Sequence, residues 1–365
     1  MRHPRVLFYA INGLGLGHVT RLLAIGRKFR RIAPEAEIVY FTSSEAEDVV
    51  FREGFAAFKV PSKTLRGQAM LRPATYSRML QTVTLNLISS FHPHVLVVDT
   101  FPAGTLQELL PVLRWDSRKV FVFRVQRPES ARSQLTQSAL ELYDLAIVPH
   151  NAGEVDVPLP ESLESTWTGP ILIRDRHETL PRSEARAVLA LPQDAPVVYV
   201  SFGGGGDTAM DEALSCAVEA LAGQTYHVAV ADAPLYRGGV RLAARTPSNV
   251  TFVRHYPMAE LMTAFDAAVS AAGYNTTMEL LHHGVPTALA PFPRQVDDQH
   301  ARARELAAEG AAVVIEPLTP SGIQDAVAAL LRPDVAETIR SRAMCRVPEN
   351  GAEHAAAAIA RLLGL

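Results

Sequence analysis

The stretch VLFYAINGLGLGHVTRLLAIGRKFRRIAPEAEIVYFT, residues 6–42, decides the fold. It starts with the apolar run 6–11, passes through a glycine-rich turn into a pattern of helical period, and ends in a second apolar run at 37–42. Continuous runs of Val, Leu, Ile and Phe are typical of strands buried on both faces of a parallel sheet. The stretch therefore predicts a strand, a helix and a parallel strand, the first unit of a doubly wound α/β domain.

The same order continues and then starts again in the second half of the chain. Apolar runs of strand length lie in the first half at 95–99, 120–125 and 145–149. Those of the second half lie within 195–207 and at 227–232, 250–256, 267–273, 286–291 and 311–317. Because domains usually have roughly 100 to 200 residues, 365 residues fit two of them. We predict two Rossmann-like α/β domains that face each other across a cleft.

Residues 156–186 are interpreted as the linker because they are rich in Pro and Glu and break both periodicities. The boundary is placed near Gly169, with an N-terminal Rossmann-like domain at 1–168 and a C-terminal one at 169–350. The last segment, 351–365, is predicted as a helix and is a candidate to pack back on the N-terminal domain.

The composition and charge of the chain argue against a nucleic-acid-binding function. With 48% hydrophobic and 20% charged residues the chain is ordinary for a globular protein. Residues 1–168 hold 19 Lys and Arg against 16 Asp and Glu, and residues 169–365 hold 16 against 22. This asymmetry fits two domains with different tasks, but it is far from the basic excess of a nucleic-acid-binding protein, so no nucleic acid partner is expected.

Neither a metal nor an organic cofactor is expected. Cys216 and Cys345 form no Cys-x-x-Cys pair and no zinc-spaced cluster with His, and the sequence has no Walker phosphate loop, Asp-x-Asp pair or Gly-x-Ser-x-Gly elbow. The N-terminus is interpreted as a strand and not as a signal peptide. No run of about 18 apolar residues occurs, which argues against a membrane span. We expect a cytoplasmic protein, with attachment to the inner face of the membrane left open.

The glycine-rich turn offers a candidate catalytic residue. Gly13, Gly15 and Gly17 let the backbone approach a ligand closely, but His18 stands where a dinucleotide fingerprint needs its third glycine. An imidazole at a helix start, beside the carboxyl ends of the strands, suits a general base. The alternative is a histidine that only caps or packs.

The strand at 95–99 ends in a second candidate, Asp99. A carboxylate at this edge of the sheet is predicted to orient His18 and to stabilise its cationic form. The alternative is that Asp99 caps a helix beginning after Pro102.

Three loops of the second half are predicted to bind a ligand. The four consecutive glycines Gly203, Gly204, Gly205 and Gly206, followed by a helix, form an anion cradle suited to a diphosphate. After the strand at 267–273, Asn275 and Thr276 are expected to reach phosphate oxygens and Glu279 to accept both hydroxyls of a ribose. The loop 291–300 is polar enough for a sugar. The alternatives are a flexible glycine loop, a helix cap with a solvated Glu279, and an ordinary polar loop.

At these residues the chain resembles the GT-B glycosyltransferases related to MurG, of the family 28 type, and the diacylglycerol glycosyltransferases. The turn ending in His18, the glycines 203–206 and the helix start at 273–279 occur in family order and at roughly family spacing, and the likeness covers nearly the whole length. The segment 92–110, HPHVLVVDTFPAGTLQELL, also resembles uncharacterised predicted glycosyltransferases.

The resemblance implies a hexosyltransferase that moves a sugar from a nucleotide diphosphate sugar, expected to be a UDP-sugar, to an acceptor hydroxyl, with inversion and without a metal. It implies an acceptor-binding N-terminal domain and a donor-binding C-terminal domain, with Asp298 or Gln299 at the donor sugar. The family's usual Gln-Gln pair is replaced at Asp298 and Gln299, so N-acetylglucosamine is not assumed.

Other functions stay open at this point. The Gly-x-Gly-His-x-x-Arg pattern at 15–21 also occurs in a UDP-sugar hydrolase, in which water would replace the acceptor. A nucleotide-sugar 2-epimerase and a non-enzymatic nucleotide-sugar-binding protein rank lower. The acceptor is unknown: residues 61–90 mix basic and apolar residues and would suit a lipid-linked or anionic acceptor, or simply form a helix with its apolar side on the core.

Overall fold

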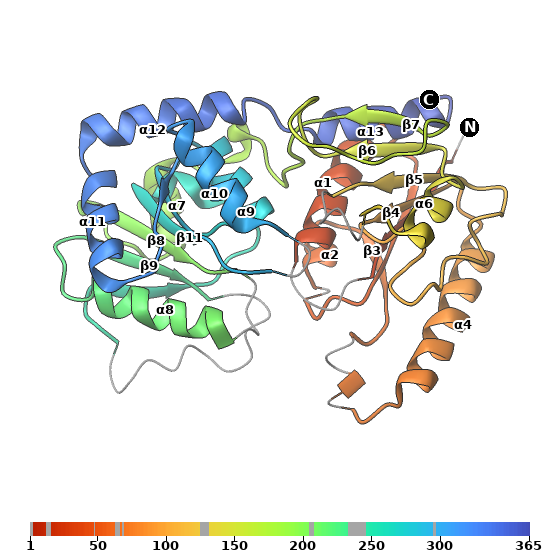
Figure 1. The fold of residues 1–365 in the computed structure, drawn as a ribbon, viewed down its shortest axis with the longest axis horizontal. Coiled ribbons are helices and arrows are strands. Elements are labelled where there is room, and N and C mark those ends of the chain that lie inside the picture. Colours follow the sequence, from red (N-terminus) through yellow and green to blue (C-terminus); the bar gives the residue numbers. More distant parts are fainter. Residues whose placement is uncertain are drawn as a thin grey trace. The chain divides into compact units, whose positions relative to one another are not determined.

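The computed structural model describes residues 3–11, 16–46, 48–62, 66–67, 69–124, 131–203, 208–232, 246–294 and 297–365. The chain forms two compact units (Figure 1). The first comprises Met1–Ile173 together with Gly351–Leu365, and the second comprises Arg174–Asn350. The main chain therefore passes from one unit to the other twice, once after Ile173 and once before Gly351.

The first unit is built on a seven-stranded parallel sheet with the strand order β3-β2-β1-β4-β5-β6-β7. Its strands are β1 (Arg5–Ala10), β2 (Glu37–Thr42), β3 (Ala56–Lys59), β4 (Val95–Asp99), β5 (Arg118–Val122), β6 (Leu145–Val148) and β7 (Glu164–Trp167). Its helices are α1 (Gly17–Ile32), α2 (Asp48–Arg52), α4 (Pro73–Phe91), α6 (Gln134–Leu140) and α13 (Ala352–Leu362).

The second unit has a six-stranded parallel sheet with the order β10-β9-β8-β11-β12-β13. Its strands are β8 (Val197–Ser201), β9 (His227–Ala231), β10 (Val250–Val253), β11 (Ala267–Ala271), β12 (Thr287–Ala290) and β13 (Val313–Val314). Its helices are α7 (Arg182–Val188), α8 (Thr208–Leu221), α9 (Tyr274–His282), α10 (Gln299–Ala308), α11 (Pro320–Leu330) and α12 (Pro333–Arg346), with 3-10 turns at Arg176–Glu178 and Met258–Ala264.

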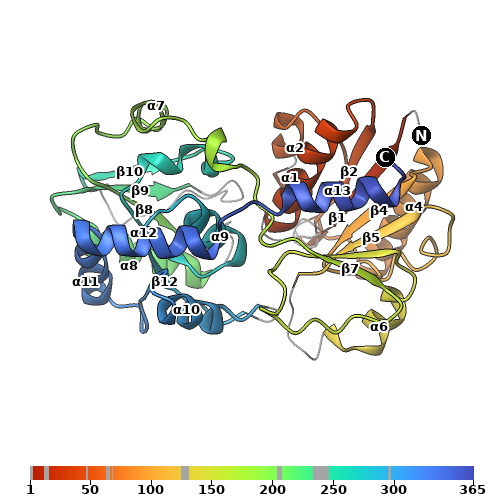
Figure 2. The same cartoon turned by 90° about the horizontal axis from the view of Figure 1, so that it is seen from above.

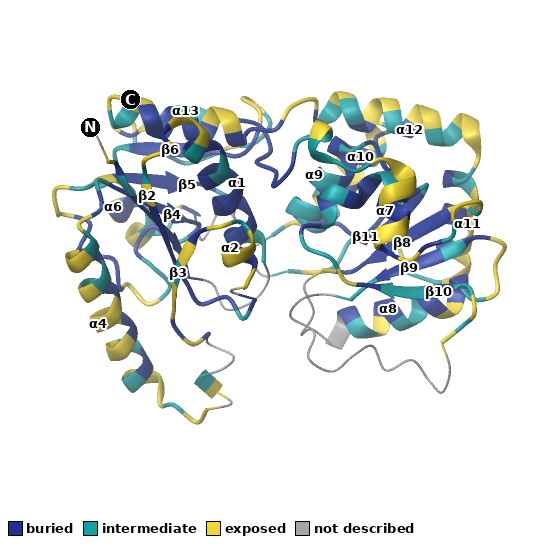
Figure 3. Ribbon diagram, turned by 180° about the vertical axis from the view of Figure 1, so that it is seen from behind, coloured by how far each residue is buried: buried dark blue, intermediate teal, exposed yellow. Residues whose placement is uncertain are grey.

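The predicted α/β class with two parallel sheets is confirmed. The inner strands of both sheets are largely buried (Figure 3), as expected where helices cover both faces of a parallel sheet. One prediction was wrong: β7 lies inside the stretch interpreted as linker. It is the outermost strand of its sheet, and its residues Glu164–Trp167 are exposed or half-buried. A polar edge strand lacks the continuous apolar run by which the other strands were found.

The helix α13 returns to the first unit and packs along α1 (Figure 2). Its buried residues are mostly small: Ala352, Ala355, Ala356, Ala358, Ile359 and Ala360.

Gly26 on α1 shows how closely this unit is packed, because a Cβ there would lie 2.0 Å from the hydroxyl of Tyr40. That hydroxyl donates a hydrogen bond to the carbonyl of Leu22 across 3.0 Å. A side chain at position 26 would therefore push the hydroxyl of Tyr40 away from this hydrogen bond.

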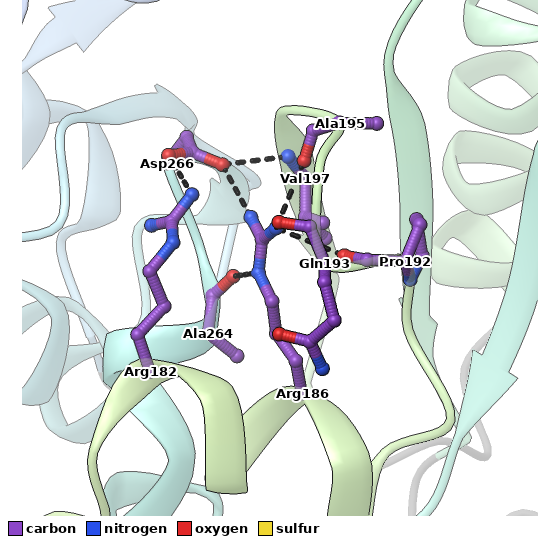
Figure 4. Close-up of polar contacts among 8 residues, drawn as sticks. All are labelled: Arg182, Arg186, Pro192, Gln193, Ala195, Val197, Ala264 and Asp266. Carbon is purple, nitrogen blue, oxygen red and sulfur yellow. Dashed lines mark hydrogen bonds and ion pairs between the residues drawn. The ribbon is translucent and has the colours of Figure 1, made fainter.

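A buried arginine joins the N-terminal ends of β8 and β11 in the second unit (Figure 4). Arg186 of α7 has no exposed surface. Its guanidinium donates to four backbone carbonyls, those of Ala264 (3.0 Å), Pro192 (2.9 Å), Gln193 (2.8 Å) and Ala195 (3.0 Å). It also donates to Asp266 Oδ2 across 2.8 Å.

The carboxylate of Asp266 accepts two further hydrogen bonds. Asp266 Oδ2 accepts the N–H of Val197 across 2.7 Å, and Oδ1 accepts from the exposed Arg182 across 2.7 Å. Arg186 and Asp266 therefore fix the segments that lead into the two central strands of the sheet.

Among the residues that the structure describes, no helix is long and apolar enough to cross a membrane.

Candidate active site

The first group of candidate residues lies where the winding of the first sheet reverses. β1 and β4 are neighbours, and the chain leaves them toward opposite edges of the sheet. At such a point the carboxyl ends of the two strands leave a crevice in which α/β proteins bind ligands. His18, at the start of α1, follows β1, and Asp99 is the last residue of β4. Gly17 begins α1, whereas Gly13 and Gly15 lie outside the described residues.

His18, Arg21, Asp99 and Thr100 form one buried network. His18 Nδ1 lies 3.2 Å from Asp99 Oδ1 and 2.9 Å from Thr100 Oγ1. Thr100 Oγ1 donates to Asp99 Oδ1 across 2.6 Å. Arg21 Nη1 donates to both carboxylate oxygens, across 3.1 Å to Oδ1 and 2.8 Å to Oδ2. All four residues are buried, with exposed fractions of 1% to 6%.

The network fixes the proton of the imidazole. Because the Thr100 hydroxyl gives its only hydrogen to Asp99, its oxygen accepts at the other contact, and His18 Nδ1 carries the proton there. The second ring nitrogen, Nε2, then holds a lone pair. A neutral imidazole of this tautomer can act as a general base through Nε2.

Burial keeps the imidazole neutral, and the neighbouring charges keep the carboxylate ionised. Burial lowers the pKa of His18, Asp99 raises it by a smaller amount, and Arg21 and Arg124 add to the lowering. Burial alone would raise the pKa of Asp99, but Arg21 and His18 outweigh it and lower that pKa to about 2. The site therefore holds a permanent carboxylate beside a histidine that is unprotonated at neutral pH.

The backbone at Thr100 is strained to reach this geometry. Thr100 has φ +71°, a left-handed conformation that is unusual for a β-branched residue. The N–H of Phe101 donates to the carbonyl of Asp99 across 2.9 Å, which closes a tight turn around Thr100. The ring centroid of Phe101 lies 6.5 Å from that of His18. No helix begins after Pro102, where turns follow instead, so the alternative in which Asp99 caps a helix was wrong.

The second group lies at the equivalent point of the second sheet. β8 and β11 are neighbours from which the chain again leaves toward opposite edges. Gly203, after β8, has φ +102°, which glycine tolerates and other residues do not. Gly204, Gly205 and Gly206 lie outside the described residues. Gly273 follows β11 and caps α9, with Asn275 and Thr276 half-buried in its first turn.

Glu279, in the second turn of α9, is a half-buried carboxylate without a side-chain partner among the described residues. Burial raises its pKa to about 7, and the nearby Arg174 opposes this rise. Arg174 is itself bound to Glu260, with Nε 2.7 Å from Oε1. A half-buried carboxylate with a raised pKa and without such a partner is costly for the fold and suits a ligand that donates hydrogen bonds.

The loop before α10 is brought to the start of α9. Within the part of the chain that the structure describes, a Cβ placed on Gly273 would have one neighbour within 4 Å, the amide nitrogen of Gln299 at 4.0 Å. Gln299 is buried, and its Oε1 accepts the N–H of Phe292 across 3.1 Å, which turns its amide nitrogen toward Gly273. Asp298 is exposed and caps α10 by accepting the N–H of Ala301 across 3.0 Å. Of the two predicted sugar contacts, Gln299 is thus the one beside Gly273, at the start of α9.

Three residues that hold these sites were not predicted. Arg21 and Thr100 bind Asp99 in the first unit. In the second unit, Arg302 of α10 donates to the carbonyl of Ala272 across 2.7 Å and to Asp297 Oδ1 across 2.6 Å. The spacing of His18 and Arg21, three residues apart on one helix, would have indicated that both face the same neighbour.

The fold agrees with what the chain resembles in sequence. A model of the glycosyltransferase family 28 C-terminal domain matches residues 209–359. A protein from Desulforudis audaxviator (strain MP104C) is 27% identical over 336 residues, which cover 86% of this chain and 87% of that protein. It is named UDP-N-acetylglucosamine--N-acetylmuramyl-(pentapeptide) pyrophosphoryl-undecaprenol N-acetylglucosamine transferase. The chain is a nucleotide-sugar glycosyltransferase related to family 28.

Solved structures share the fold of this glycosyltransferase. The spinosyn rhamnosyltransferase SpnG complexed with thymidine diphosphate aligns with a TM-score of 0.67 at 17% identity and covers 98% of this chain and 100% of its own. MurG of Acinetobacter baumannii aligns with a TM-score of 0.60 at 15% identity, covering 98% and 100%. The predicted GT-B fold is thereby confirmed. The matched family and the relative from Desulforudis are both named as transferases, so the hydrolase alternative has no support from them.

Proposed function

We propose that this glycosyltransferase moves a hexosyl group from a UDP-sugar to an acceptor hydroxyl, with inversion and without a metal, and that His18 is its general base. The buried network around Asp99 carries the proposal, because it leaves His18 neutral with Nε2 free of the network. The first unit supplies this base, and the second unit binds the nucleotide. The choice of UDP follows the name of the relative from Desulforudis.

In the proposed reaction, Nε2 of His18 takes the proton of the acceptor hydroxyl. The hydroxyl oxygen then forms a bond to the anomeric carbon on the face opposite the diphosphate, and the bond from that carbon to the diphosphate oxygen breaks. The negative charge that grows on the leaving diphosphate is stabilised by the N-terminus of α9 and by the glycines at 203–206. Asp99 stabilises the imidazolium that results.

On the donor, Glu279 is proposed to bind the ribose hydroxyls and Gln299 the sugar. The uncommitted carboxylate of Glu279 and the amide of Gln299 support this assignment. Asn275 and Thr276 are proposed to contact the diphosphate. Asp298 is proposed to act on the sugar less directly, because its carboxylate already caps α10.

The proposed function is tested with purified full-length protein and a panel of UDP-, TDP- and GDP-sugars in the presence of EDTA. Release of nucleoside diphosphate is followed with and without lipid and soluble acceptor extracts. Acceptor-dependent release from a UDP-sugar, with the anomeric configuration of the product inverted as read by NMR, is expected. Release that needs no acceptor, that requires an added divalent cation, or that occurs only from TDP- or GDP-sugars would contradict the corresponding part of the proposal.

Replacing Glu279 by Gln should separate stability from donor binding. Since the pKa of Glu279 is about 7 in the fold against an ordinary 4.5, its burial costs nothing below pH 4.5, and the cost grows as the pH rises to 7. The variant should therefore be more stable than the native chain at pH 8.5, by at most roughly 3 kcal/mol, and no more stable at pH 4. The measurement is urea unfolding at both pH values without ligand.

The same variant should bind UDP at least about tenfold more weakly, because a neutral amide replaces the acceptor of both ribose hydroxyls. Calorimetric titration with UDP measures this. Glu219→Gln, the same change on the exposed side of α8, is the matched control and should alter neither property. Equal stability changes at both pH values would contradict the raised pKa of Glu279, and unchanged affinity for UDP would remove Glu279 from the donor site.

We also propose that the protein is cytoplasmic and that α4 contacts a membrane surface when the acceptor is lipid-linked. α4 buries Tyr76, Leu80, Thr84 and Ile88. Its other side exposes half of Met79 and 40% of Val83, and Met70 just before it is 89% exposed. Arg72 and Arg78 are exposed on the same segment. Apolar residues flanked by arginines suit anionic lipid.

Co-sedimentation with vesicles of phosphatidylglycerol, compared with phosphatidylcholine, tests this contact. The native chain should bind the anionic vesicles, and Arg72→Gln with Arg78→Gln should weaken binding by roughly 30-fold, since each basic residue near the surface contributes about 1 kcal/mol. The control is Arg332→Gln on the second unit, whose side chain is 65% exposed. Equal binding to both kinds of vesicle, or none to either, would rule the contact out.

A further inference from the structure

Two side chains of α1 face one buried carboxylate. His18 and Arg21 are three residues apart, so both lie on the side of the helix that meets the end of β4. Arg21 is 2% exposed and Asp99 5% exposed. Arg21 Nη1 holds Oδ2 at 2.8 Å, and His18 Nδ1 lies 3.2 Å from Oδ1. Asp99 therefore has two candidate partners for its negative charge.

The two partners would have opposite effects on a base. In a buried pair of only His and Asp, the carboxylate draws a proton onto the imidazole and raises its pKa. A cationic imidazole has no lone pair with which to accept a proton. Here the guanidinium of Arg21 supplies the positive charge, so the imidazole need not. Among the residues that the structure describes, the other charged group that acts on His18 is Arg124, after β5, which is also cationic, and Thr100 is neutral.

We propose that Arg21 is a positioning residue of the transfer reaction: by pairing with Asp99 it leaves His18 neutral, with Nδ1–H directed at Thr100 and Asp99 and Nε2 available for the acceptor proton. This inference rests on the proposed role of His18 as the base. It assigns to the arginine of the Gly-x-Gly-His-x-x-Arg pattern a task that is separate from binding donor or acceptor. The burial of Arg21 supports this, because a side chain 2% exposed is engaged inside the unit.

The test is a pH titration of His18 by NMR in the full-length, ligand-free protein, with the His18 resonance assigned by its loss in His18→Gln. Arg21→Gln should raise the pKa of His18 by about one unit or more, because the charge of Asp99 is then uncompensated. Arg21→Lys keeps a positive charge and should stay closer to the native value. The acid limb of the pH profile of kcat/KM should move upward by the same amount in Arg21→Gln, with activity largely restored at alkaline pH.

The outcomes separate this inference from the proposed function. If the pKa of His18 is unchanged or falls in Arg21→Gln, or if activity is lost equally at every pH, Arg21 is only structural and the inference is overturned. If the pKa rises but the activity profile does not move, His18 is not the base, and the place of Arg21 in the reaction is overturned with it. An inactive native chain in the donor panel would by contrast reject the proposed function while the NMR titration still reports on Arg21.

A second variant covers the case in which Arg21→Gln does not fold. Arg21→Gln combined with Asp99→Asn replaces the ion pair by two amides of similar shape, so the net charge beside His18 remains zero. If charge compensation is what Arg21 provides, the pKa of His18 in this double variant stays close to the native value. A rise of about one unit or more in it would overturn the inference.

Discussion

Replacing His18 by Ala is expected to lower kcat by about 10²- to 10⁴-fold, the usual contribution of a positioned general base. Binding of the nucleoside diphosphate should stay unchanged, since the residues proposed to bind it belong to the second unit. The first quantity is measured as turnover with the donor that the panel identifies, and the second by calorimetric titration. Loss of turnover without loss of binding places His18 in the chemical step.

His354→Ala is the matched control, because His354 is an exposed histidine of α13 in the same unit. It should leave both quantities within the error of the measurement. His18→Gln adds a second comparison, because its amide can still hydrogen-bond to Thr100 but cannot take up a proton. Turnover by either His18 variant within threefold of the native chain would show that another group, or water, accepts the proton.

Replacing Arg186 by Met should destabilise the second unit by about 3–5 kcal/mol, which is typical of removing one partner of a buried ion pair. Four carbonyls lose their donor, and Asp266 Oδ2 keeps only the N–H of Val197. Met has a similar length, so the loss reflects mainly the polar contacts. Urea unfolding followed by circular dichroism measures the effect, with the transition of the second unit moving to lower urea.

Arg182→Met is a demanding control, because Arg182 binds the other oxygen of the same carboxylate. Its side chain is 48% exposed, so its loss should cost only about 0–1 kcal/mol. The chain offers an internal reference as well: its only two tryptophans, Trp115 and Trp167, both belong to the first unit. The unfolding transition of the first unit, followed by their fluorescence, should lie at nearly the same urea concentration in both variants. Equal destabilisation by Arg182→Met and Arg186→Met would show that burial of Arg186 does not determine how much its contacts stabilise the second unit.

The sequence predicts those parts of the fold whose residues are buried on both sides. The runs at 37–42 and 95–99 coincide with β2 and β4, because the middle of a strand inside a parallel sheet is covered on both faces and is therefore apolar. β3 and β7 escape this rule, since they are the two outermost strands of their sheet and carry exposed residues. Only the pairing with β2 and β6 gives them strand structure.

The sequence predicts which residues of the candidate site lie close together, but it does not predict the hydrogen bonds between them. His18 and Asp99 follow adjacent strands, so their proximity follows from the topology alone. The hydroxyl of Thr100 reaches both of them only because its backbone has φ +71°, a conformation that the sequence gives no reason to expect at a threonine. Likewise, that Gln299 rather than Asp298 faces Gly273 depends on which of them caps α10.

The double passage of the chain between the units has a consequence for biosynthesis. As the ribosome makes the protein, residues 1–173 emerge before α13, which covers α1 in the finished structure. The side of α1 that α13 covers thus stays exposed to water until the whole second unit has been made. The second unit, by contrast, is continuous in sequence from Arg174 to Asn350, and Asn350 Nδ2 binds Asp175 Oδ1 across 2.8 Å, so its two ends close on each other. The part of the chain that is translated first is therefore the part that completes its packing last.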